Sequence, residues 1–190
     1  MADLTCRPLG PDDFPLIERL FGPKGAASGC WCMYFNIAGG KDWRDSKGEP
    51  NRVAFAARIA AGEVHAILAL EGNEVVGYCR LGPRASFERI DRSRVLARPP
   101  QDDTWSVVCF FIHRRARRRG VARALLESAT AHAFAAGAPA IEAYPAVPPK
   151  DGKISGAFAF SGLPRLYEAA GFVPVPNPAG VRPIYRRAAP

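Results

Sequence analysis

Val107-Val-Cys-Phe-Phe-Ile-His-Arg-Arg-Ala-Arg-Arg-Arg-Gly-Val-Ala-Arg-Ala-Leu-Leu126 is the stretch that decides the fold of this chain. Its apolar start predicts a buried strand, its arginines a turn, and its last part an amphipathic helix that opens at Gly120. A strand that leads into a helix N-terminus creates an anion site, because the first helical turn leaves backbone N–H groups unpaired at the positive end of the dipole. Gly120 lacks a Cβ and Ala122 has a small side chain, so a phosphate can approach the backbone there. The spacing Arg117-x-x-Gly120-x-Ala122 therefore predicts a cradle for a pyrophosphate.

The arginines of this stretch have a second interpretation. Six of them lie between Arg114 and Arg123, and such a run is also typical of a solvated surface or a nucleic-acid-binding patch. A nucleic-acid site usually interleaves aromatic residues for base stacking, and this turn has none. The phosphate cradle is therefore the favoured interpretation, and a basic module that binds nucleic acid is the alternative.

Length and composition fit one globular domain over residues 1–190. The hydrophobic fraction of 48% and charged fraction of 23% are ordinary for such a domain. A net charge of +8 favours anionic partners. No apolar run approaches the ~18 residues of a membrane span, and the N-terminus lacks the pattern of a secretory signal. We therefore expect a cytoplasmic protein that does not bind membranes.

The cysteines do not form a recognisable framework. An odd count without regular spacing argues against a secreted disulfide scaffold, and the Cys30-x-Cys32 pair lacks the further ligands of a zinc site. We therefore expect no metal. The five cysteines are Cys6, Cys30, Cys32, Cys79 and Cys109.

The rest of the chain predicts alternating strands and helices. A strand–helix–strand unit formed by residues 105–112, 120–136 and 141–144 implies a parallel pair of strands. A hairpin is expected at Gly72-Asn73. The other predicted elements are strands at 4–9, 64–70, 74–81, 172–175 and 181–187, helices at 11–21, 51–60 and 161–170, and connections at 22–50, 83–100 and 145–156.

A second motif, Leu166-Tyr-Glu-Ala-Ala-Gly-Phe172, lies downstream of the first. Together the two motifs resemble the GNAT acyltransferase superfamily, in which Gln/Arg-x-x-Gly-x-Gly/Ala follows an apolar strand and a short helix ends in Tyr-Glu-x-x-Gly-Phe. Gly171 suits the left-handed end of that helix. This chain differs from the family pattern at Phe160, where the family often has an asparagine.

The resemblance implies an α/β (α+β) fold with a mixed, mostly antiparallel central sheet, flanked by helices and splayed between its fourth and fifth strands. Acetyl-CoA would lie in this opening as co-substrate. The strand residues Phe110, Phe111 and Ile112 would meet the pantetheine, chiefly through backbone groups. The pyrophosphate would be wrapped by Arg117, Arg118, Arg119, Gly120, Val121 and Ala122. The side chains of Arg114, Arg115, Arg118 and Arg119 meet either the 3′-phosphate or solvent.

The activity implied by the resemblance is N-acetyl transfer from acetyl-CoA to a primary amine, by direct attack in a ternary complex. Tyr167 occupies the position of the tyrosine that protonates the departing thiolate; simple packing in the core is the alternative. Glu142 is the candidate general base, because a carboxylate in an apolar strand favours proton uptake, although an exposed strand position would also explain it. His113 and His65 are further candidates. Cys109 has no recognisable histidine partner, so covalent catalysis is not expected there.

The acceptor site is expected in the connection at 22–50, where Gly29-Cys-Trp-Cys-Met-Tyr-Phe35 gathers aromatic residues. Trp31, Tyr34 and Phe35 are the candidate acceptor-binding residues, and a hydrophobic cluster that anchors a long connection is the alternative. The sequence leaves four kinds of acceptor open: an antibiotic, a polyamine, a peptide N-terminus or a lysine. It also leaves open whether the protein forms a homodimer. A GNAT fold that senses acyl-CoA without turnover is the remaining alternative function.

Overall fold

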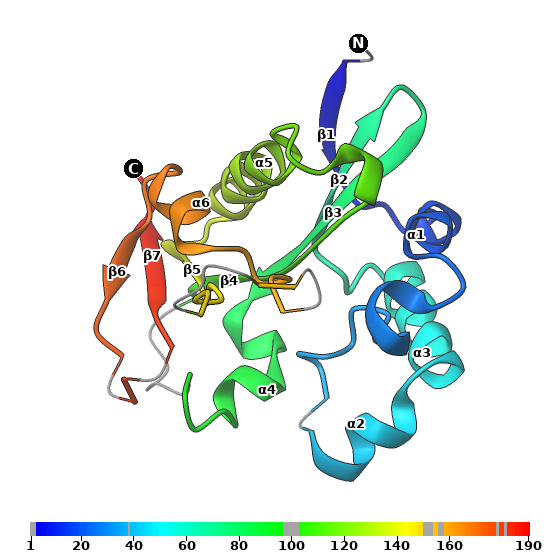
Figure 1. Ribbon diagram of the computed structural model, residues 1–190, viewed down its shortest axis with the longest axis horizontal. Coiled ribbons are helices and arrows are strands. Elements are labelled where there is room, and N and C mark those ends of the chain that lie inside the picture. The colour runs from blue at the N-terminus through cyan, green and yellow to red at the C-terminus, as the bar shows by residue number, and fades with distance from the viewer. Residues whose placement is uncertain are drawn as a thin grey trace.

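The computed structural model describes residues 3–37, 39–96, 103–149, 154–155, 158–177, 179–180 and 182–190. Within these ranges the chain forms a seven-stranded sheet with the order β1-β2-β3-β4-β5-β7-β6 (Figure 1). Parts of the predicted segments 83–100, 145–156 and 181–187 fall outside the described residues. The strands are β1 (Leu4–Pro8), β2 (Ala66–Glu71), β3 (Glu74–Pro83), β4 (Trp105–Ile112), β5 (Ala140–Ala143), β6 (Val173–Val175) and β7 (Ile184–Ala188).

Helical segments cover the sheet on both faces. The long helix α5 packs across β1 to β4 on one face, and α1 and α3 cover the other face of the N-terminal strands (Figure 1). The connection at 22–50 contains a helix, as does the segment at 83–100. The helical elements are α1 (Phe14–Phe21), α2 (Gly40–Ser46), α3 (Glu49–Ala60), η2 (Arg84–Ser86), α4 (Glu88–Asp91), η3 (Arg114–Ala116), α5 (Val121–Ala135) and α6 (Pro164–Glu168). The segment η1 (Gly25–Gly29) is a turn with non-helical backbone at Ala26, Ala27 and Ser28.

The strand pairing confirms the predicted fold class. Every neighbouring pair in the sheet is antiparallel except β4 and β5, which are parallel because α5 carries the chain back to the starting edge. The sheet is therefore mixed and mostly antiparallel. Among the described residues, no helix is long and apolar enough to cross a membrane.

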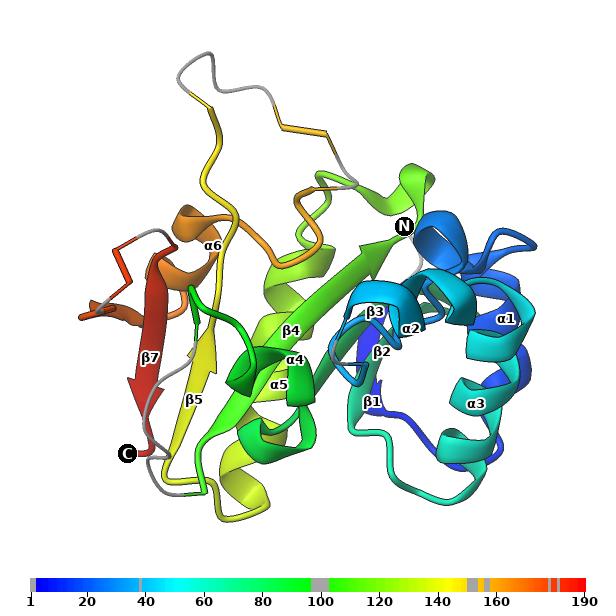
Figure 2. The same ribbon diagram turned by 90° about the horizontal axis from the view of Figure 1, so that it is seen from below.

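The parallel seam between β4 and β5 is short. Only the first three residues of β4 pair with β5, in the register Trp105↔Ile141, Ser106↔Glu142 and Val107↔Ala143. Beyond Val107, β4 continues to Ile112 while β5 has already ended at Ala143. The two strands diverge from this point, as Figure 2 shows. The sheet is thus splayed between its fourth and fifth strands.

A β-bulge at Val108 changes which face of the sheet each β4 side chain meets. Arg80 pairs with Cys109 and Leu81 with Val107, so Val108 is an extra residue in β4. Before the bulge, Trp105 and Val107 pack on the α5 face. After it, the even-numbered residues Phe110 and Ile112 take that face, and Cys109 and Phe111 face the α1 side.

Candidate active site

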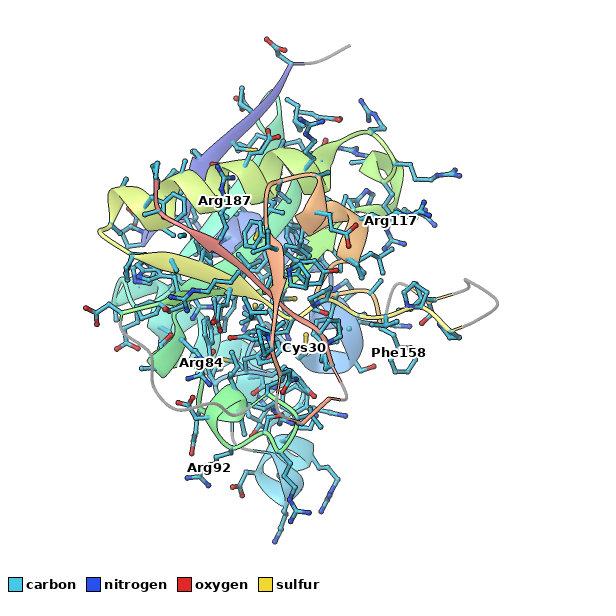
Figure 3. The ribbon with its side chains drawn as sticks, turned by 90° about the vertical axis from the view of Figure 1, so that its left-hand side faces the viewer. Cys30, Arg84, Arg92, Arg117, Phe158 and Arg187 are labelled. Carbon is cyan, nitrogen blue, oxygen red and sulfur yellow. The ribbon has the colours of Figure 1, made fainter. Side chains whose placement is uncertain are left out.

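A cavity of about 600 Å³ lies along the outer half of β4, beyond the seam with β5. Its walls come from β4, from the segment between α1 and α2, and from the chain just before α6. Arg117 and Cys30, both labelled in Figure 3, belong to its lining. The lining residues are Phe21, Ala26, Ala27, Ser28, Cys30, Cys32, Tyr34, Phe35, Trp43, Cys109, Phe110, Phe111, Ile112, Arg117, Ala159 and Phe160.

The predicted phosphate cradle is the turn between β4 and α5. Gly120 is the N-cap of α5 with φ +81°, in the left-handed region that glycine adopts at little cost, and Arg118 has φ +61°. A Cβ at Gly120 would meet no atom within 4 Å, so the backbone is open there. The first N–H groups of α5, at Val121 and Ala122, have no intrahelical acceptor. The turn therefore presents unpaired donors and a helix dipole to one side of the site.

Ion pairs divide the arginines of the turn into two groups. Arg115 pairs with Glu74, Arg119 with Glu71 at 2.9 Å, and Arg123 with Glu127 at 2.8 Å. Among the described residues no carboxylate pairs with the other three, Arg114, Arg117 and Arg118. These three are therefore the arginines left to meet an anion.

The backbone groups predicted to meet pantetheine already have partners within the chain. The Phe110 N–H donates to the Phe160 carbonyl at 2.6 Å. The Ile112 carbonyl accepts from Nε of Arg117 at 3.1 Å. Phe111 contributes its ring to the cavity and packs edge-on against Phe21. A pantetheine amide can use the Phe110 N–H only if the segment around Phe160 moves away from β4.

Tyr167 is fully buried beside this segment. Its hydroxyl donates to the Ser161 carbonyl at 2.7 Å, and its ring packs against Phe172 and Phe110. Burial raises the pKa of Tyr167 well above its ordinary value, so the hydroxyl keeps its proton. Tyr167 is not among the described residues that line the cavity.

The placement of Glu142 favours a structural role for this residue over that of general base. Its carboxylate is 1% exposed and pairs with Arg186 at 3.1 Å. The Tyr144 hydroxyl donates to the same carboxylate at 3.4 Å. Glu142 lies on the short seam with β4, and the described lining of the cavity does not include it. A buried ion pair explains this residue in structural terms.

The three candidate acceptor-binding residues lie in two different parts of the structure. Tyr34 and Phe35 line the cavity, where their rings meet Phe160. Trp31 lies elsewhere: it is 3% exposed and packs between Phe14 and Phe21 in the core under α1. A left-handed backbone at Trp31, with φ +40°, turns its ring toward this core. The cluster interpretation therefore holds for Trp31.

Several lining residues were not singled out as site residues from the sequence. Trp43 follows the candidate segment closely, and its ring contacts Tyr34 at 5.2 Å between centroids. Phe160 was noted only as a departure from the family pattern, yet it forms one wall. The sequence pairs Cys30 with Cys32 and places Cys109 on a strand, but no local pattern brings Cys109 to the other two thiols. Among the described residues, no group of His, Cys, Asp and Glu could hold a metal ion.

Comparisons with known proteins concern the family and the fold of this chain. The sequence model of the acetyltransferase (GNAT) family matches residues 31–157. No curated protein sequence matches the chain significantly.

Solved structures with low sequence identity share the fold. A GNAT-family protein from Desulfovibrio desulfuricans is 19% identical, with a TM-score of 0.56 over 98% of this chain and 99% of the other. The PaiA N-acetyltransferase of Thermoplasma acidophilum, solved with coenzyme A, is 13% identical, with a TM-score of 0.56 over 98% and 99%. YncA of Salmonella typhimurium, solved with acetyl-CoA, is 15% identical, with a TM-score of 0.53 over 97% and 93%.

Proposed function

The chain belongs to the GNAT acetyltransferase family, and we propose that it transfers an acetyl group from acetyl-CoA to a primary amine by direct attack within a ternary complex. One observation carries the proposal: the open Gly120 turn at the N-terminus of α5 adjoins a cavity that follows the outer half of β4. A phosphate-binding turn beside an elongated apolar cavity fits a ligand with an anionic head and an acyl tail.

Acetyl-CoA would bind with its pyrophosphate on the turn from Arg117 to Ala122. Backbone N–H groups supply most of the contacts in this arrangement, and Arg118 and Arg114 add charge without having to break an existing ion pair. Arg117 is placed to contact both parts of the ligand, since it lines the cavity and also bonds the end of β4. The acetyl group would then point along β4 toward Cys109.

Tyr167 is the proposed proton donor to the CoA thiolate. Its hydroxyl stays protonated because burial raises the pKa of the phenol. The hydroxyl now donates to the Ser161 carbonyl, in the same segment whose Phe160 carbonyl bonds Phe110. Movement of this one segment would free both the Phe110 N–H for pantetheine and the Tyr167 hydroxyl for proton transfer.

The cavity wall favours an acceptor with an apolar or aromatic body. Seven of the lining residues are aromatic, and none of the described lining residues is an aspartate or a glutamate. The Arg89 guanidinium covers the outer face of Tyr34 at 4.0 Å from the ring centre. A protonated amine gains no carboxylate partner here, whereas an amine of low basicity is already neutral and needs no base before it attacks. The proton that its nitrogen loses after the attack would pass to solvent. We therefore propose a weakly basic amine on an aromatic or apolar body, in preference to a polyamine.

A panel of amines with acetyl-CoA as donor tests the proposal, with release of free thiol as the readout. Aromatic amines, whose amino group is neutral at neutral pH, should be acetylated with higher kcat/KM than polyamines or lysine peptides. A preference for polyamines would contradict the acceptor class. Tight binding of acetyl-CoA without turnover of any amine would contradict the enzyme and favour the sensor alternative. Salt-sensitive nucleic-acid binding that acetyl-CoA does not affect would favour a basic binding module.

A further inference from the structure

Three thiols lie on the wall of the cavity. Cys30 and Cys32 come from the segment between α1 and α2, and Cys109 comes from β4 directly after the bulge. Cys109 is also on the part of β4 that the acetyl end of the proposed ligand would reach. The thiols therefore stand close to the path of a thioester, and all three are free.

Cys32 is the member of this group that carries negative charge most readily. The Tyr78 hydroxyl donates to its Sγ at 3.2 Å. Burial raises the pKa of Cys32, but the hydrogen bond from Cys109, the charge of Arg80 and the Tyr78 hydroxyl outweigh burial and bring the pKa below its ordinary value. The pKa of Cys109 is raised well above its ordinary value, first by its interaction with Cys32 and then by burial, so Cys109 stays protonated, and its thiol lies 3.8 Å from the Phe110 carbonyl.

Arg80 supplies an independent reason for an anion at this position. The side chain is 2% exposed, and a guanidinium keeps its charge in a protein. Its Nη1 donates to the His65 carbonyl at 2.9 Å, while its buried Nε has no partner among the described residues. No described carboxylate pairs with Arg80. The guanidinium also lies over the Phe87 ring at 5.4 Å, and its charge is one of the causes that lower the pKa of Cys32. A thiolate at Cys32 would therefore help to compensate this buried cation.

We propose that Cys32 is a second acceptor in the cleft, which takes the acetyl group from acetyl-CoA when no amine is present. The Cys32 thiolate would attack the carbonyl carbon of the thioester, the bond from that carbon to the CoA sulfur would break, and CoA would leave as a thiolate that takes a proton from solvent or a neighbouring donor. One thioester replaces another, so the step needs no oxidant and is freely reversible by CoA. This inference rests on the proposed binding of acetyl-CoA.

Acetylation would also remove the negative charge beside Arg80. The buried guanidinium would then lose this compensating charge, so the acetylated form is disfavoured relative to an ordinary thioester. We therefore expect the modification to be reversed when free CoA is added. It would act as a temporary occupant of the cavity when acetyl-CoA is abundant and the amine is scarce.

The test uses the full chain and acetyl-CoA with a radiolabelled acetyl group, without any amine. After an acid quench and denaturation, the wild type should retain label on the peptide that contains Cys32, and hydroxylamine or added CoA before the quench should remove it. Cys32→Ser keeps an acceptor for the Tyr78 hydroxyl but should lose the label. Cys6→Ser, which changes a thiol outside the cavity lining, should keep it. Tyr78→Phe should be labelled several-fold more slowly. Loss of the Tyr78 hydroxyl raises the pKa of Cys32, and the fraction of thiolate then falls by more than the nucleophilicity of each thiolate rises.

Two further measurements are made on each variant: calorimetry shows whether it binds acetyl-CoA, and the thermal midpoint shows whether it is folded. Wild-type protein that binds acetyl-CoA but takes up no label would overturn this inference and leave the proposed function intact. Label that persists in a folded Cys32→Ser variant would also overturn it. Failure of the wild type to bind acetyl-CoA would overturn the proposed function, and this inference with it.

Discussion

At the scale of single residues, Gly120 is the position in the proposed cradle where the backbone most requires glycine. Its φ of +81° strains any other residue, and the space around it is open to a ligand. Gly120→Glu should abolish acetyl-CoA binding, because a carboxylate would stand where a phosphate must approach. Calorimetry is the measurement.

Gly137 provides a matched control for that variant. It has φ +85°, a Cβ added to it would meet no atom within 4 Å, and it lies just beyond the other end of α5. Gly137→Glu should therefore show the same backbone strain and normal binding. Equal loss of binding in both variants would mean that strain, and not the phosphate site, is responsible.

A substitution at Tyr167 can distinguish a catalytic role of its hydroxyl from a packing role of its ring. Tyr167→Phe keeps the ring in the core and removes only the hydroxyl, so the fold should lose about 1 kcal/mol. If the hydroxyl protonates the thiolate, kcat should fall by ~10²–10⁴. The measurement is kcat beside the thermal midpoint, with an acceptor found by the amine panel. A kcat close to that of the wild type would assign Tyr167 to packing alone.

At the scale of elements, the segment between α1 and α3 illustrates where sequence prediction ends. Its composition predicts an aromatic wall, but composition does not tell which ring turns inward. The left-handed backbone at Trp31 sends that ring into the core, and α2 brings Trp43 to the cavity. By contrast, β4, the arginine turn and α5 are continuous in sequence, so local patterns predict them well. The thiol cluster joins distant segments and leaves no local signal.

The two tryptophans should respond differently to truncation. Trp43→Ala should raise the KM for the amine and leave acetyl-CoA binding nearly unchanged, because the ring lines the acceptor part of the cavity. Trp31→Ala should instead cost about 3–5 kcal/mol of stability, as expected for a large buried ring. Steady-state kinetics and thermal melts measure the two effects. A Trp43→Ala protein with an unchanged amine KM would contradict the acceptor assignment.

At the scale of the whole molecule, the sheet consists of β1–β4 and β5–β7, joined by a seam of three residue pairs. This short seam leaves room for the cavity while Glu142 and Arg186 secure β5 against β7. The positive charge of the arginine run before and in α5 is partly neutralised, since three of its six arginines form ion pairs with carboxylates.

Stability of the whole chain should depend on pH through His65. Burial, followed by the charges of Arg80 and His132, lowers the pKa of His65 below its ordinary value of 6.5. The unfolded chain then binds the proton first as pH falls, so stability is full above about pH 6.5 and decreases below it. Thermal midpoints across this range should show the decrease, and His65→Gln should reduce it. An equal decrease in the variant would assign the effect to other groups.

The bulge in β4 has a consequence for insertions and deletions. Val108 is the one residue that shifts the alternation of side chains between the two halves of the strand. Deleting it would leave Val107 opposite Leu81 and Cys109 opposite Arg80, so regular alternation would keep Cys109 and Phe111 on the α1 side and Phe110 and Ile112 on the α5 side. A chain without Val108 would therefore lose the buried Val108 side chain and still keep the same residues of β4 on the cavity wall and in the core. Deletion of Val108 should therefore be better tolerated than deletion of Phe110, which would turn Phe111 toward α5 and Ile112 to the opposite face, and only the second deletion should yield insoluble protein.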